Sequence, residues 1–146
     1  MGEKVAFDVV GFYEDAYKET VDQLVADGVI NFHGFQTDVH PFYEATDCVV
    51  LPSYHEGMSN VLLEGAATGR ALITSDIPGC REAVDDVVSG YLCPVQDAEA
   101  LTKAMRSFAE LPEKWKVEMG RRGRERMEQK FSKTAVVAET IKHLEI

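Results

Sequence analysis

The sequence predicts an α/β fold in which a parallel sheet is sandwiched by helices. Short apolar runs alternate with segments of helical periodicity along the whole chain, which is typical of consecutive strand–helix units. These runs are a few residues long and are bounded by glycine or proline, as expected for strands buried on both faces. The 146 residues have the length of one domain, and 45% of them are hydrophobic, which is enough to form a core.

The first half of the chain predicts three strands and two helices. The strands are expected over residues 5–10, 29–33 and 48–51, and the helices over 13–26 and 41–45. Gly11 ends the first strand, Gly28 closes the first helix and Pro52 ends the third strand. Glycine and proline commonly interrupt regular structure at such positions, so these boundaries are well marked.

The second half predicts two further strands and four helices. The strands are expected over residues 71–74 and 91–93, and the helices over 60–68, directly after the cap Asp97, over 113–129 and over 133–144. Gly69 lies just past the first of these helices, as a C-terminal glycine should. In the third of them, we expect Trp115, Met119 and Met127 to pack in the core.

The composition argues against several classes of partner. The formal net charge of -10 repels nucleic acid and anionic lipid, so we expect neither nucleic acid nor a membrane surface as a partner. No apolar run approaches the roughly 20 residues that span a bilayer, and no secretory signal pattern is present, so we expect a cytoplasmic protein. The three cysteines and four histidines show no metal-binding spacing, which predicts reduced thiols and no bound metal.

The segment 53–60 is the first candidate for a binding site. It joins the third strand to the following helix, and in a parallel sheet ligands bind beyond the carboxyl ends of the strands. The backbone N–H groups of Met58, Ser59 and Asn60 are expected to be free at the start of that helix, where they can bind a phosphate or a sugar oxygen. Gly57 has no side chain and would let a ligand approach the backbone closely.

Two acidic residues accompany this helix start. Glu56 lies in the loop, and Glu64 lies about one turn inside the helix, on the same face as Asn60. Carboxylates accept hydrogen bonds from the vicinal hydroxyls of a sugar or a ribose, whereas they repel phosphate. The spacing alone favours a plainer alternative, in which Glu64 faces solvent on an amphipathic helix and Glu56 is an ordinary loop acid.

A longer pattern around these acids resembles a known family. Glu56, a gap of seven residues and Glu64, within the segment 51–66, are similar to the signature of the group 1 retaining glycosyltransferases of two-Rossmann-domain (GT-B) architecture. The similarity continues through the segments 9–11, 32–34, 47–53, 69–76, 79–84, 90–92 and 97–101. It covers nearly the whole chain and implies a Rossmann-like fold that forms one half of such an enzyme.

The resemblance also implies a function and residue roles. Glu56 would be the catalytic residue, in contact with hydroxyls of the donor sugar, and the backbone over 57–60 would face the sugar and the diphosphate. Glu64 would bind the ribose, and Gly34 and Phe35 would border the base. Such enzymes transfer a hexose from a nucleotide diphosphate sugar to an acceptor with retention of configuration, for example in polysaccharide biosynthesis, and they need no metal or other cofactor.

The chain departs from the family pattern at its start. The family places an Arg and a Lys that stabilise the leaving diphosphate upstream of anything matching Val5, and the second glycine of its first loop is replaced here by the segment 12–14. We therefore expect residues 1–146 to be a donor-binding domain that lacks the first strand–helix unit and the N-terminal acceptor domain, and that is inactive alone. A nucleotide-sugar epimerase half and a non-catalytic nucleotide- or sugar-binding module are the alternatives.

Overall fold

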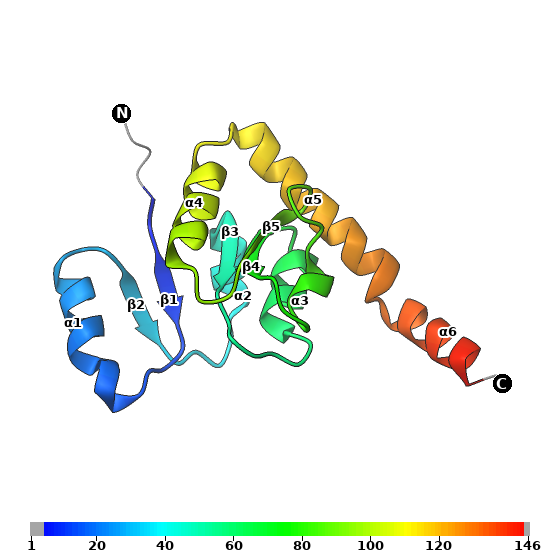
Figure 1. Ribbon diagram of the computed structural model, residues 1–146, viewed down its shortest axis with the longest axis horizontal. Helices are drawn as coiled ribbons and strands as arrows, with labels where there is room; N and C mark the ends of the chain where they lie inside the picture. Colours follow the sequence, from blue (N-terminus) through cyan, green and yellow to red (C-terminus); the bar gives the residue numbers. More distant parts are fainter. Residues whose placement is uncertain (1–4, 145–146) are drawn as a thin grey trace. The chain divides into compact units, whose positions relative to one another are not determined.

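The computed structural model describes residues 5–144, which form two compact units. The first unit ends at Phe42 and the second begins at Tyr43. All strand pairs are parallel and helices flank the sheets, so the predicted α/β class is confirmed (Figure 1). Because apolar runs locate strands but do not determine which strands pair, the sequence predicts one sheet where the structure has a two-stranded and a three-stranded sheet.

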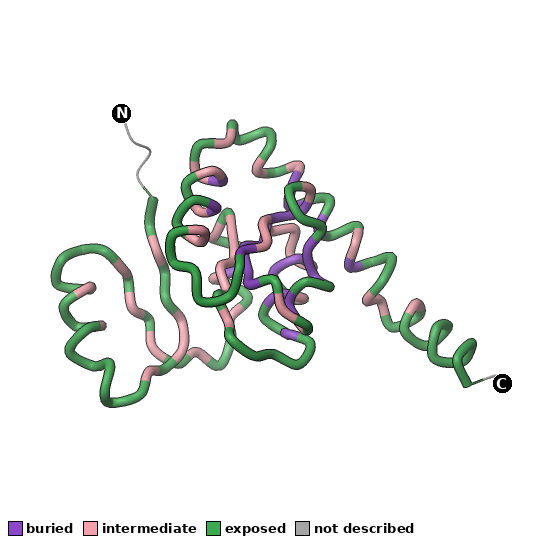
Figure 2. The backbone as a smooth tube through the Cα atoms, viewed as in Figure 1, coloured by how far each residue is buried: buried purple, intermediate pink, exposed green. Residues whose placement is uncertain are grey.

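The first unit contains two short strands and one α-helix. Its elements are β1 (Asp8–Val10), a 3-10 helix (Asp15–Tyr17), α1 (Lys18–Ala26) and β2 (Asn31–Gly34). β1 pairs with β2 so that Asp8 lies beside Asn31 and Val9 lies beside Phe32. None of the residues 5–42 is buried, and Figure 2 accordingly shows no purple segment in this unit.

Three predicted boundaries in the first unit are wrong. The first strand begins at Asp8 rather than at Val5, and the second begins at Asn31 rather than at Val29. The helix predicted from Tyr13 begins only with the 3-10 turn at Asp15. Glu14 is extended, with φ -71° and ψ 148°, so the helical conformation cannot start before it. Apolar residues at 5–7 and 12–13 therefore lie outside regular structure.

The second unit is built around a three-stranded parallel sheet. Its strands are β3 (Cys48–Leu51), β4 (Ala71–Ser75) and β5 (Gly90–Cys93), in the order β3-β4-β5. β4 pairs on both sides, and all five of its residues are buried. These strands lie within one residue of the predicted ranges, because Pro52, Gly69 and Pro94 bound the apolar runs sharply.

Helices cover both faces of this sheet (Figure 1). The helices after β2 are α2 (His40–Ala45), which spans the boundary between the two units, α3 (Asn60–Ala67), a 3-10 helix (Arg81–Ala83), α4 (Ala98–Ala109), α5 (Glu113–Lys130) and α6 (Lys133–His143). α6 contacts α5 and extends away from the sheet in Figure 1, and none of its residues is buried. On one face, Leu62 of α3 and Met127 of α5 share a buried cluster with Leu72. On the other face, Phe108 of α4 shares a second cluster with Ile73. Leu72 and Ile73 are consecutive residues of β4, so their side chains point to opposite faces.

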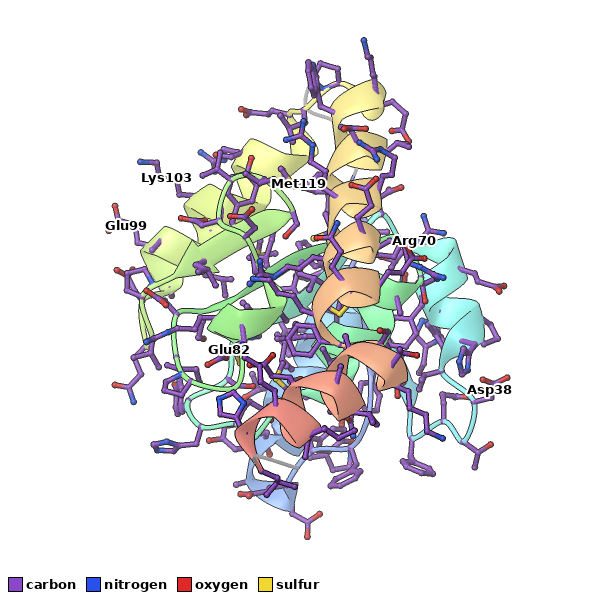
Figure 3. All side chains as sticks on the ribbon, turned by 90° about the vertical axis from the view of Figure 1, so that its right-hand side faces the viewer. Asp38, Arg70, Glu82, Glu99, Lys103 and Met119 are labelled. Atoms are coloured by element: carbon purple, nitrogen blue, oxygen red, sulfur yellow. The ribbon has the colours of Figure 1, made fainter. Side chains whose placement is uncertain are left out.

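Helix α5 buries only part of its length. Met119 and Met127 are buried, as predicted (Met119 is labelled in Figure 3). Trp115 is 51% exposed, so the prediction that it packs in the core is wrong. It lies in the first turn of α5, before Met119, which is the first buried residue of this helix. Helical spacing identifies the apolar face but not the point at which that face reaches the core.

The sequence predicts reduced cysteines and no membrane-spanning helix. Cys48, Cys80 and Cys93 are free thiols, the last two buried and Cys48 half-buried. Burial raises the pKa of the Cys48 thiol to about 12, so this thiol stays protonated at neutral pH. Within residues 5–144, no helix is long and apolar enough to cross a membrane.

Candidate functional site

Two loops meet at one edge of the three-stranded sheet. β3 and β4 are parallel, so their carboxyl ends lie at the same edge, and residues 52–59 and 76–80 follow them. The N–H of Ser59 in the first loop donates a hydrogen bond to the carbonyl oxygen of Gly79 in the second, over 3.1 Å. These loops and the start of α3 form the candidate functional site.

Gly79 allows the two loops to approach each other closely. Its φ is +87°, in the left-handed region, and a Cβ at this position would lie 1.8 Å from the carbonyl oxygen of Gly57. Any other residue would force the backbone to move. The N–H of Gly79 donates a hydrogen bond to Oε2 of Glu82 over 2.8 Å, so Glu82 stabilises this turn.

Ser59 caps the start of α3. It is 4% exposed, and its Oγ accepts a hydrogen bond from the N–H of Leu62 over 3.4 Å. The prediction that the Ser59 N–H is free is wrong, because that group already donates to Gly79. The N–H groups of Asn60 and Val61 lie in the first turn, where no earlier carbonyl of the same helix can accept them. With the helix dipole, they favour an anion at this end of α3.

Glu56 lies in the loop before α3 and is exposed. Its Oε1 accepts a hydrogen bond from Oγ of Ser53 over 2.8 Å. Since Ser53 follows β3 after a single proline, this bond links the carboxylate to the end of the strand. Gly57 and Met58 are also exposed, so a ligand can reach this part of the loop.

Glu64 lies one turn inside α3 and is exposed, but its carboxylate has a buried partner. Its Oε2 accepts a hydrogen bond from the hydroxyl of Tyr43 over 3.1 Å, and Tyr43, in α2, is only 8% exposed. Burial, together with the hydrogen bond to Glu64, raises the pKa of Tyr43 to about 12. The sequence does not reveal this pair, because the two residues are 21 positions apart and no helix or strand period links them.

Arg70 fixes the end of α2, beside which it lies in Figure 3. Its Nε donates to the carbonyl oxygen of Tyr43 over 2.8 Å, and one Nη donates to the carbonyl oxygen of Glu44 over 2.9 Å. The guanidinium thereby binds carbonyls that a helix terminus leaves without intrahelical partners. Arg70, Tyr43 and Glu64 form a connected series of hydrogen bonds between the start of β4 and α3.

The arrangement suits a ligand that carries both anionic and hydroxyl groups. The start of α3 offers N–H groups to an anion, and Glu56 and Glu64 offer carboxylates to hydroxyls. That both carboxylates border one pocket stays a prediction. Two hollows of the second unit, of about 280 and 480 Å³, lie on α5 and α4 and are lined by other residues. Among residues 5–144, no group of three His, Cys, Asp or Glu side chains could hold a metal ion.

Gly34 and Phe35, the predicted base contacts, belong to the first unit. The carbonyl oxygen of Gly34 accepts a hydrogen bond from the N–H of Gly11 over 2.9 Å, and Phe35 is 68% exposed. An exposed aromatic ring offers a face on which a base can stack. Their contact with a base stays a prediction.

Comparisons with known sequences identify a family. The family described as "Glycosyl transferases group 1" matches residues 2–110. The lipopolysaccharide core biosynthesis glycosyltransferase LpsE of Rhizobium meliloti is 28% identical over 126 residues, which are 86% of this chain and 37% of that protein. The N,N'-diacetylbacillosaminyl-diphospho-undecaprenol alpha-1,3-N-acetylgalactosaminyltransferase of Campylobacter jejuni is 28% identical over 108 residues, which are 74% of this chain and 29% of that protein. The chain thus spans about a third of the length of these curated relatives.

Solved structures share the fold. Sucrose-phosphate synthase of Thermosynechococcus elongatus matches with a TM-score of 0.77 and 27% identity, over 94% of this chain and 37% of that one. HepE of Anabaena, solved in complex with UDP, matches with a TM-score of 0.82 and 20% identity, over 97% of this chain and 41% of that one. Both matches cover nearly all of the present chain and less than half of a larger protein.

Proposed function

This chain belongs to the group 1 glycosyltransferase family, and on that premise we propose that it binds the nucleotide diphosphate sugar donor of a retaining sugar transfer. One observation carries the proposal: Glu56, the start of α3 and Glu64 lie on one segment that follows β3 at the carboxyl edge of the sheet. HepE has the same fold and is solved with UDP and with UDP-glucose, which supports a ligand of this class.

Each part of the segment has a role in the proposed reaction. The diphosphate binds at the N–H groups of Asn60 and Val61, Glu56 contacts hydroxyls of the donor sugar, and Glu64 binds the ribose. As the bond between sugar and diphosphate breaks, negative charge grows on the leaving diphosphate, and the start of α3 stabilises it. In this proposal no metal takes part, and the N–H groups of α3 share the stabilisation of the diphosphate with the Arg and Lys that the family pattern places upstream of Val5.

The acceptor belongs to another part of the enzyme in this proposal. The chain spans only about a third of its curated relatives, and sugar transfer needs groups on both sides of the reacting carbon. We therefore expect residues 1–146 to bind the donor without transferring its sugar. The location that we propose for the complete enzyme is the cytoplasm, on the basis of the sequence pattern alone. Transfer by this chain alone would contradict the first expectation.

Isothermal titration with UDP and with UDP-glucose tests the donor site. Glu64→Ala should weaken the binding of both ligands, because both contain the ribose, whereas Glu56→Ala should weaken only the binding of UDP-glucose, which contains the sugar. Each loss should be about 1 to 3 kcal/mol, or roughly 5- to 150-fold in Kd, as for hydrogen bonds to a charged group.

Glu99→Ala is the matched control. Glu99 is an exposed acid in the first turn of α4 (Figure 3), so its removal changes the net charge by the same amount without touching the proposed site. Its Kd for both ligands should equal that of the unmodified chain. If Glu56→Ala and Glu64→Ala behave like this control, the proposed donor site is wrong.

A further inference from the structure

We propose that Tyr43 is a positioning residue that holds the Glu64 carboxylate ready to accept hydrogen bonds from the ribose hydroxyls of the donor. The inference rests on the proposed function, since it assigns Glu64 to the ribose. It adds a second residue, from a different helix, on which recognition of the ribose depends. Tyr43 itself need not contact the ligand.

The contact joins a buried donor to an exposed acceptor. The Tyr43 side chain is 8% exposed, and its hydroxyl reaches Oε2 of Glu64 over 3.1 Å. Within the described chain, this is the one hydrogen bond recorded for that carboxylate. Oε2 is therefore engaged on the protein side, and Oε1 stays available to a ligand in the exposed position of Glu64.

An exposed glutamate without such a partner samples many rotamers. A ligand that binds it must order the side chain and loses part of the binding free energy in doing so. A hydrogen bond from a rigid buried ring removes part of this cost before the ligand arrives, because an aromatic side chain has only two rotatable torsions. The donor direction is fixed as well: the tyrosine hydroxyl keeps its proton at neutral pH, as its pKa is raised to about 12.

The backbone of Tyr43 is fixed in turn by Arg70. The guanidinium donates to the carbonyl oxygens of Tyr43 and Glu44, over 2.8 and 2.9 Å, and Arg70 directly precedes the fully buried strand β4. The position of the tyrosine ring is thus tied to the most buried element of the second unit. A carboxylate held by this ring is held relative to the sheet and not only relative to its own helix.

Tyr43→Phe tests the inference because it removes only the hydroxyl. Kd should be measured for UDP and for 2′,3′-dideoxy-UDP, which lacks both ribose hydroxyls. We expect Tyr43→Phe to weaken UDP binding about three- to tenfold, the usual effect of ordering one flexible side chain, and to leave binding of the dideoxy ligand unchanged. A general loosening of the fold would instead weaken both ligands equally, and that result would overturn the inference.

The double variant Tyr43→Phe/Glu64→Ala provides the second measurement. If Tyr43 acts through Glu64, the double variant binds UDP no more weakly than Glu64→Ala alone. Additive losses would show that Tyr43 acts by another route. If Glu64→Ala weakens UDP binding but Tyr43→Phe does not, the inference fails and the donor site stands. If Glu64→Ala has no effect on UDP binding, the assignment of Glu64 to the ribose fails and the inference fails with it.

Discussion

The two units of the chain both pair parallel strands, yet only the second has a buried interior. Every buried side chain in the described part of the chain lies at or after Tyr43. In the second unit, β4 has a strand on each side and helices on both faces. In the first unit, a two-stranded sheet has one α-helix, and Phe12 and Phe35 are 86% and 68% exposed. Two strands and one helix do not enclose enough volume to bury a side chain fully, whereas three layers do.

This difference bears on the candidate site. Glu56, Glu64 and Tyr43 belong to the unit with the buried core, and packing therefore fixes the elements that carry them. Gly34 and Phe35 belong to the unit without one. We expect the same substitution to lower the free energy of unfolding more in the second unit than in the first, and the following predictions test this.

Replacing one leucine in each unit should give the largest difference in stability loss between the two units. Leu62 is 0% exposed in the core of the second unit, whereas Leu24 of α1 is only half-buried. Leu62→Ala should cost about 3 kcal/mol in the free energy of unfolding, because it removes packing and leaves a cavity, and Leu24→Ala should cost less than about 1 kcal/mol. Urea unfolding can be followed by far-ultraviolet circular dichroism and by the fluorescence of Trp115, the chain's single tryptophan. Equal losses would remove the distinction between the units.

Replacing one glycine in each unit should give a smaller difference in stability loss between the two units. Gly79 and Gly28 both have left-handed backbones, with φ +87° and +70°, but a Cβ at Gly28 meets nothing within 4 Å. Gly28→Ala should therefore lower the free energy of unfolding by only about 1 kcal/mol, which is the cost of holding an alanine in the left-handed conformation. Gly79→Ala adds the overlap with the carbonyl oxygen of Gly57 and should cost at least about 2 kcal/mol. It should also weaken UDP-glucose binding, which Gly28→Ala should not, and titration of both variants checks this.

The same contrast explains which features the sequence predicts. The ranges of β3, β4 and β5 are nearly correct because their apolar runs are buried or half-buried and are sharply bounded by proline and glycine. In the first unit, the short paired strands and the extended Glu14 leave weaker signals, and the starts of three elements are misplaced. The apolar run predicts a strand best where it is at least half-buried along its length and ends at a proline or glycine.

For the candidate site, local sequence gives the segment but not its partners. The segment over 53–60 and the two acids Glu56 and Glu64 follow from residue type and spacing, whereas the cap at Ser59 is seen only in the structure. Two hydrogen bonds of the site join separate elements. The N–H of Ser59 donates to the carbonyl oxygen of Gly79, and the hydroxyl of Tyr43 donates to Glu64. No period or motif links residues 20 or so positions apart, so only the tertiary structure reveals these contacts.

The smallest expected effect belongs to the first unit. Oδ1 of Asp8 accepts hydrogen bonds from His33 and Asn31, over 2.7 and 3.3 Å, and the bond with His33 is the main reason why the pKa of Asp8 lies below 3.8. A carboxyl whose pKa is lowered by folding stabilises the fold above its ordinary pKa, and this contribution is lost as the pH falls through the folded-state pKa. Because the pair is exposed, Asp8→Asn should cost less than about 1 kcal/mol at pH 7, and progressively less in acid as the pH falls through the lowered pKa of Asp8. Urea unfolding of both proteins at neutral pH and in acid measures this, and a larger cost, or one that persists in acid, would show that the first unit depends on this contact more than its exposure implies.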